Sequence, residues 1–242
     1  MFKKYQGKLY CFSPPVMLAT FLIEFGFAFY TLWRYKLNSV SRLAFVMLIS
    51  LGTFQLAEFM VCGGLGLTHM EWARVGYGAL TLLPALGIHM VVSLAGKKKP
   101  LLVNVAYASG VAFAAYYLVS EGAVTGSTCY ANYAVFHVEH ASVWPFALYY
   151  YGWMLTGTNL AFRWASQLPK RRKALQAMAM GYLVFVLPTT MFNLVDPSTM
   201  KAIPSIMCGF AVLLAFVVVF RVLPVGSQVR GSVQGIRLKL RI

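Results

Sequence analysis

The segment from Cys129 to His140 gathers the residue types of this chain that most often take part in chemistry. Its sequence is CYANYAVFHVEH, which supplies one thiol, two imidazoles and one carboxylate, from Cys129, His137, His140 and Glu139. Thiolate and imidazole are ligands for Zn and Cu. His137 and His140 are three residues apart, so both rings would point to one side of a helical turn. The segment is therefore a candidate Zn or Cu site formed by His137, His140 and Glu139.

A disulfide would use the same thiol. The chain has four cysteines, and Cys62 and Cys129 are both expected at the outer face of the protein. Thiols in an oxidising compartment are usually oxidised. We therefore favour a Cys62–Cys129 bridge, which would close a loop of more than 60 residues and contribute several kcal/mol. Cys11 is the alternative partner of Cys129. The remaining possibility is that the two histidines only cap the following helix.

Two further carboxylates lie inside apolar runs, at Glu24 and Glu58. Glu24 is about nine residues from the outer end of its run, near the middle of a membrane at a rise of roughly 1.5 Å per residue. An ionised carboxylate there costs several kcal/mol unless it is paired or hydrated. Polar residues in these runs recur at helical spacing, so they should face other helices. The candidate ligand-binding residues are Glu24, Gln55, Glu58, Thr81 and Asn193.

The elements that position these residues are long apolar segments. The chain is 60% hydrophobic and only 11% charged, whereas a soluble domain is about a quarter charged. A helix of about 20 apolar residues crosses the hydrocarbon core of a bilayer. Seven such runs lie near residues 15–33, 40–62, 72–95, 100–119, 141–162, 174–195 and 203–223. The expected fold is all-α, a polytopic membrane protein with a bundle of seven transmembrane helices and no second domain.

Lysine and arginine indicate the orientation of the bundle, because they are enriched on the cytoplasmic side. If the first run enters from outside, sixteen basic residues are inside: Arg34, Lys36, Arg42, Lys97, Lys98, Lys99, Arg163, Lys170, Arg171, Arg172, Lys173, Arg221, Arg230, Arg237, Lys239 and Arg241. Five are outside: Lys3, Lys4, Lys8, Arg74 and Lys201. We therefore predict a plasma-membrane protein with its N-terminus out, its C-terminus in, and its first helix retained.

The predicted organisation is a helical domain over residues 1–223 and a basic cytoplasmic tail over residues 224–242. The net charge of +15 does not indicate nucleic-acid binding, because basic loops face the anionic inner leaflet of the membrane. The tail ends in IRLKLRI, an alternation of apolar and basic residues that suits an extended segment. Such a segment can lie on the lipid surface or pair with a partner protein. The tyrosines at 149–151 lie deep enough in the fifth run to line a cavity.

Three short motifs lie near the ends of the predicted helices: CFS at 11–13, QLAEFMVCGG at 55–64, and Cys129 followed by His137 before the fifth run. Together they resemble an uncharacterised bacterial family of seven-helix proteins, which opens with Cys-Trp-Ser and carries Glu or Gln and Cys at matching places. Phe12 stands where that family has Trp, and ten residues precede Cys11. The resemblance covers roughly the first 150 residues. It implies the fold and no activity.

The last run contains no lysine, which excludes attachment of retinal at the position that retinal proteins use. These features favour a binding or sensory module, or an accessory subunit, over an enzyme. Its polar pocket would open outward and take a small ligand or cation. One alternative is a membrane-embedded metal-dependent hydrolase that uses His137, His140 and Glu139. Another is a structural subunit that associates with a membrane-protein partner or with copies of itself.

Overall fold

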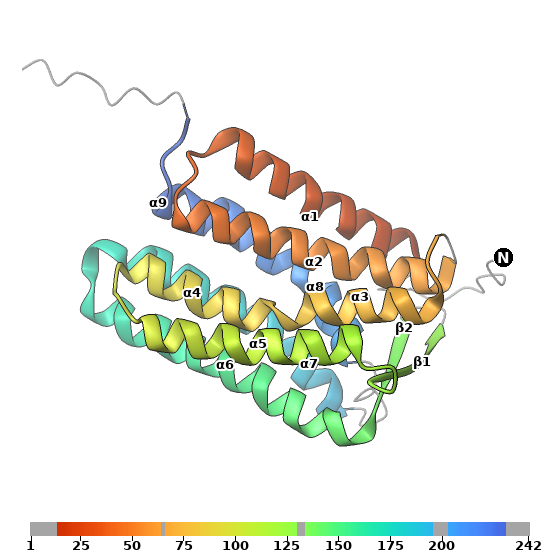
Figure 1. Ribbon diagram of the computed structural model, residues 1–242. Helices are drawn as coiled ribbons and strands as arrows, with labels where there is room; N and C mark the ends of the chain where they lie inside the picture. Colours follow the sequence, from red (N-terminus) through yellow and green to blue (C-terminus); the bar gives the residue numbers. More distant parts are fainter. Residues whose placement is uncertain (1–13, 64–65, 130–133, 196–202, 231–242) are drawn as a thin grey trace, which may run out of the picture.

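The computed structural model describes residues 14–63, 66–129, 134–195 and 203–230 (Figure 1). Helices make up most of it: α1 (Pro14–Arg34), α2 (Ser39–Gly63), α3 (His69–Thr81), α4 (Leu83–Ala95), α5 (Pro100–Val119), α6 (His140–Gln167), α7 (Arg172–Val195) and α8 (Ile203–Val217). After α8 come a π-helical turn (Val218–Val222) and α9 (Leu223–Gly226), and a 3-10 turn (Pro169–Arg171) precedes α7. These helices follow the seven apolar runs closely.

The described part of the chain is mostly helical, as expected, with one small sheet. Between the fourth and fifth apolar runs lie the antiparallel strands β1 (Val124–Cys129) and β2 (Ala134–Val138). Their register pairs Thr128 with Val135 and Cys129 with Ala134, and a bulge interrupts it between Val124 and Gly126. Thr and Val are β-branched and fit a pleated strand. We call this end of the bundle, where the two strands lie, the hairpin end (Figure 1).

The third apolar run forms two helices, α3 and α4, which meet at Leu82. Pro84 follows that junction, and its lack of a backbone N–H removes one helical hydrogen bond. At this junction the hydroxyl of Tyr149, which belongs to α6, donates a hydrogen bond to the carbonyl oxygen of Thr81 over 2.6 Å. The junction is therefore held from α6.

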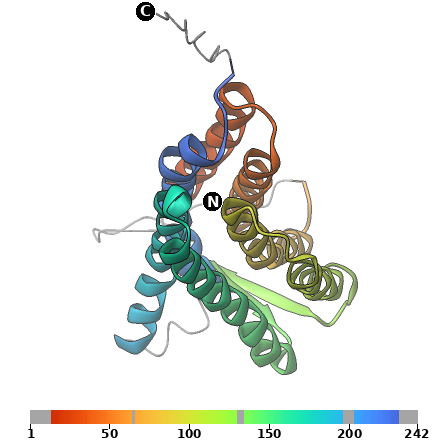
Figure 2. The ribbon, with the colours of Figure 1, turned by 90° about the vertical axis from the view of Figure 1, so that its left-hand side faces the viewer.

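The helices form two rows that meet at α1 and α8. Viewed along the helices (Figure 2), α1 to α5 form one row and α6 to α8 the other. In the first row α2 contacts α1 and α3, and α3 contacts α5. In the second row α7 contacts α6 and α8. The rows join through α1 with α8 and α4 with α6, and the hairpin contacts α2, α3 and α8.

Five helical stretches in the described part of the chain are long and apolar enough to cross a membrane. They are Pro15–Arg34, Ser39–Gly63, His69–Ala95, Pro100–Val119 and Gly209–Gly226. The outer faces of the helices carry exposed apolar side chains, for example Phe29 on α1, Leu101 on α5 and Leu148 on α6. Polar side chains such as Glu24 and Gln55 are buried. Apolar residues outside and polar residues inside are what a lipid environment requires, so the chain is a membrane protein.

The end opposite the hairpin is basic. The described basic residues there are Arg34, Lys36, Arg42, Lys97, Lys98, Lys99, Lys170, Arg171, Arg172, Lys173 and Arg230. The chain after α9 returns to the α1–α2 connection, where Tyr35 and Val229 form an antiparallel β-bridge. The Lys36 N–H donates to Gln228 O and the Arg230 N–H to Arg34 O, each over 2.8 Å. Residues 228–230 are thus hydrogen-bonded to the connection between α1 and α2.

Candidate functional site

A disulfide fixes the hairpin to the helices. Cys62 lies in the last turn of α2 and Cys129 ends β1, and the two are bonded with their Cα atoms 5.8 Å apart. This is the pair that the sequence favoured over Cys11, which lies outside the described residues. The bridge joins positions 67 residues apart, and closing a loop of that length contributes about 4 kcal/mol in the chain-entropy account. The hairpin is therefore held firmly against α2.

A cavity of about 370 Å³ lies under the hairpin, and aromatic rings form most of its wall. We call it the aromatic cavity. Its lining residues are Tyr77 and Leu80 of α3, Tyr117 of α5, Val135, Phe136, His137 and Val138 of β2, His140, Val143, Trp144, Phe146, Ala147, Tyr150 and Tyr151 of α6, and Met207 of α8. The volume falls in the range of small-molecule sites. Four separate parts of the bundle and one strand thus enclose a single space.

The rings of the cavity wall support one another. The Tyr77 centroid lies 4.7 Å from that of Tyr117 and 5.9 Å from that of Phe136. Phe146 meets Tyr117 edge to face at 5.3 Å. On its far side Phe136 packs edge to face on Phe54 of α2 at 5.6 Å. These separations are those of favourable aromatic pairs, so the wall is a packed surface whose ring faces and edges are fixed.

Polar groups sit at one side of the aromatic cavity. His137 and His140 line it and are both exposed, as is Trp144, so the cavity wall reaches the surface beside them. The Nε2 atom of His137 is hydrogen-bonded to Thr128 Oγ1 across the hairpin at 2.7 Å. Deeper in, the Tyr117 hydroxyl donates to Ser142 Oγ over 3.3 Å. The cavity therefore has an apolar interior and a polar mouth.

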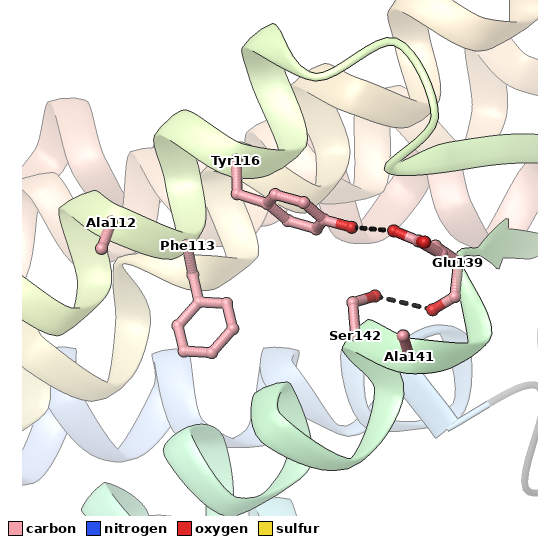
Figure 3. A pocket seen from close by; sticks show the side chains of 6 residues that line it. All are labelled: Ala112, Phe113, Tyr116, Glu139, Ala141 and Ser142. Carbon is pink, nitrogen blue, oxygen red and sulfur yellow. Dashed lines mark hydrogen bonds between the residues drawn. The ribbon is translucent and has the colours of Figure 1, made fainter.

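A second, shallower pocket of about 330 Å³ lies between α5 and α6 (Figure 3). Its lining residues are Ala112, Phe113, Tyr116, Glu139, Ala141 and Ser142. In it the Tyr116 hydroxyl donates to the Glu139 carboxylate, and the Ser142 hydroxyl donates to Glu139 O over 2.8 Å. Glu139 immediately precedes α6, where a negative charge is favoured by the helix dipole. The carboxylate is thus already engaged by the protein.

The residues of the predicted Zn or Cu site lie on two different elements. His137 lies in β2 while His140 begins α6, so the two do not share a helical turn as the prediction assumed. Cys129 is consumed by the disulfide, and Glu139 accepts a hydrogen bond from Tyr116. Within the part of the chain that the structure describes, no three His, Cys, Asp or Glu side chains are grouped to hold a metal ion.

The predicted ligand-binding residues lie elsewhere in the bundle. Glu24, Gln55, Glu58 and Thr81 are buried, as expected for polar residues in lipid. None of these four lines the aromatic cavity or the shallower pocket. The side chain of Asn193 lies outside the described residues. The Thr81 hydroxyl donates to Tyr77 O over 2.6 Å, within its own helix. The buried polar residues Glu24, Gln55, Glu58 and Thr81 are therefore not part of the lining of either pocket.

Sequence reasoning named two residues of the aromatic cavity wall as candidates for lining a cavity, Tyr150 and Tyr151. It missed Tyr77, Tyr117 and Phe146, which come from three different helices. One local signal was available, because Tyr116 and Tyr117 directly precede the hairpin segment and so had to lie near its base.

In comparisons with protein-family models, with curated proteins and with solved structures, nothing matches this chain.

Proposed function

We propose that this protein is an integral membrane binding module and that the aromatic cavity is its ligand site. The observation that carries the proposal is a ring-walled cavity of about 370 Å³ covered by a hairpin that a disulfide ties to α2. A preformed, mostly apolar cavity with a few polar groups is typical of small-molecule sites. Nothing in its lining resembles a nucleophile activated by a base, so binding is favoured over catalysis.

The lining defines the chemistry of the ligand. Fixed ring faces and edges favour a flat or chain-like apolar body, since such a body gains stacking and burial without rearranging the wall. His137 and His140 at the mouth provide hydrogen-bonding partners for one polar end. The lining residues include no Lys or Arg to pair with an anion, and aromatic faces attract cations. The expected ligand is an amphipathic molecule whose polar end is neutral or positively charged.

We further propose that seven helical segments span the plasma membrane, with the hairpin end outside. Two observations support this orientation. Among the described residues, Arg74 is the basic residue near the hairpin, and the other basic residues lie toward the opposite end. Loops rich in Lys and Arg usually stay on the cytoplasmic side. In addition, the Cys62–Cys129 disulfide needs an oxidising compartment. The cavity mouth would then lie near the outer membrane surface, with the basic end on the anionic inner leaflet.

Filling the cavity tests the proposal. Ala147 lines the cavity, whereas the neighbouring Leu148 points outward and is 73% exposed. Protein purified in mild detergent should retain a small molecule detectable by native mass spectrometry. Ala147→Trp should reduce its occupancy at least tenfold, because the indole occupies the cavity. Leu148→Trp, which adds the same ring on the lipid side, should leave occupancy unchanged. Equal occupancy in both variants, or no retained molecule in the unaltered protein, would show that the cavity is not the ligand site.

A further inference from the structure

Glu24 is a fully buried carboxyl group inside the helix bundle. It lies in the middle of α1 and has no exposed surface. Neither of its carboxylate oxygens has a hydrogen-bond partner. A buried charge without a partner destabilises a membrane protein by several kcal/mol. Protonation would remove the charge but would still leave an O–H donor and a carbonyl oxygen unsatisfied. A positively charged ligand that contacts both oxygens would neutralise the charge and also give each oxygen a partner.

The helix facing Glu24 brings a second carboxyl group close to it. Gly52 lets α2 approach α1 closely, since a Cβ at that position would lie 3.5 Å from the Cβ of Glu24 and overlap the Phe25 ring. Gln55 and Glu58 follow on α2 one and two turns further toward the hairpin end, and both are buried. The carboxyl groups of Glu24 and Glu58 are close enough for their charges to interact.

The other groups around Glu24 supply oxygen or are apolar. Thr20, one turn away on α1, donates its hydroxyl hydrogen to Val16 O and Met17 O, which leaves the oxygen free to accept. The helix α8 also packs against α1, through Phe27 with Phe216. The sequence of α8 contains no Asp, Glu, His, Lys or Arg. Glu58 is therefore the ionisable group that faces Glu24 from these two helices.

We propose that Glu24, Glu58 and Gln55 bind a hard cation between α1 and α2. Carboxylate and amide oxygens are the ligands that alkali and alkaline-earth cations take. Na⁺, K⁺ and Ca²⁺ all bind to carboxylate and amide oxygens, and the site would select among them by ionic radius and charge. Mg²⁺ gives up its water reluctantly, and so does not fit a buried site. This cation site is distinct from the aromatic cavity, whose lining includes none of these residues.

Carbodiimide labelling of the full-length protein in lipid nanodiscs tests the cation site. Dicyclohexylcarbodiimide is apolar and modifies buried carboxyl groups, and a bound cation protects them. Modification of Glu24, followed by peptide mass spectrometry, should slow at least fivefold in Na⁺, K⁺ or Ca²⁺ relative to choline at equal ionic strength. Mg²⁺ should not protect. The ion that protects identifies the ligand. Equal labelling in every salt, protection by Mg²⁺ alone, or no labelling of Glu24 would overturn the proposal.

Two variants separate a specific site from a general effect of salt. Glu58→Gln removes one ligand charge and should abolish the protection of Glu24, whereas Glu121→Gln, in the turn before β1, should keep it. The unaltered protein supplies the main result, so the test does not depend on a variant that folds. Protection that persists in Glu58→Gln would show that Glu58 is not a ligand and would overturn the proposed pair.

Discussion

The aromatic cavity and the Glu24 carboxyl group differ in how completely the protein satisfies its own polar groups. Around the cavity His137 bonds to Thr128, and Tyr117 bonds to Ser142. At Glu24 both carboxylate oxygens are buried without a partner. A satisfied, ring-walled space gains most from an apolar occupant, whereas an unsatisfied carboxylate gains most from a charged one. The two regions of one small bundle are therefore suited to opposite kinds of ligand.

The regions also differ in access. The cavity wall includes the exposed residues His140 and Trp144, so a ligand can reach it beside the hairpin. Glu24 has no exposed surface and lies in the middle of α1. Exchange of an ion there requires α1 and α2 to separate, or a path of water between them. We therefore expect binding to the cavity to be fast and ion exchange at Glu24 to be slow.

Orientation gives the largest expected effect, because labelling is all or none. After mild reduction of intact cells, a membrane-impermeant maleimide should modify Cys129, which ends β1 at the hairpin end. The reagent should reach it from outside without lysis if the cavity mouth is extracellular. A Cys62→Ala/Cys129→Ala double variant should lose this labelling. Modification of Cys129 only after lysis would reverse the orientation and place the cavity mouth in the cytoplasm.

Loss of the disulfide should affect the cavity far more than the carboxyl pair. In the Cys62→Ala/Cys129→Ala double variant the hairpin loses its covalent link to α2, and the free energy of unfolding should fall by about 2–5 kcal/mol. Thermal unfolding in detergent measures that loss. Phe136 of the cavity wall lies on β2, which is paired with the released strand β1, so ligand retention should fall as well. Protection of Glu24 by its cation should remain, and an equal loss at both sites would mean that they are coupled.

A smaller effect is expected where α1 and α2 touch. Gly52→Ala places a methyl group against the Phe25 ring and Glu24, and overpacking of this kind costs about 1–3 kcal/mol. It should also weaken cation protection at Glu24. Gly26→Ala on α1 is the matched control, because a Cβ there meets nothing within 4 Å. That variant should be neutral or stabilising by up to about 1 kcal/mol. Thermal unfolding measures the stability of both variants. Ligand retention in the aromatic cavity should be unchanged in both.

The helix bounds were predictable because a run of apolar residues must match the thickness of the membrane core. Pro14 and Pro100 stand at helix starts as expected. The break at Leu82 was missed, although Pro84 signals it in the sequence. The hairpin between the fourth and fifth runs was also missed, although its β-branched residues favour strands. Each of these features is local, so the residues near it in the sequence indicate the helix start, the break or the strand.

The sites were harder to predict because they depend on contacts between distant segments. The depth of Glu24 in its run predicted burial correctly, since depth follows from sequence position. The position of Glu24 relative to the hairpin does not follow from sequence, and the lining of the aromatic cavity does not include Glu24. The cavity wall combines Tyr77, Tyr117, Phe136 and Phe146 from four elements. No spacing rule links residues so far apart in the chain, and only the packing of the two rows brings them together.

The bridge between Tyr35 and Val229 has a consequence for the order of assembly during synthesis. At roughly 5–20 residues per second, on the order of 10–30 s separate completion of α2 from the appearance of residue 230. During that interval α1 and α2 can pair with each other, but the face of α1 that meets Phe216 has no partner. The helix α1 is thus covered by α8, which is made much later. Glu24 enters the membrane well before the bundle around it is complete.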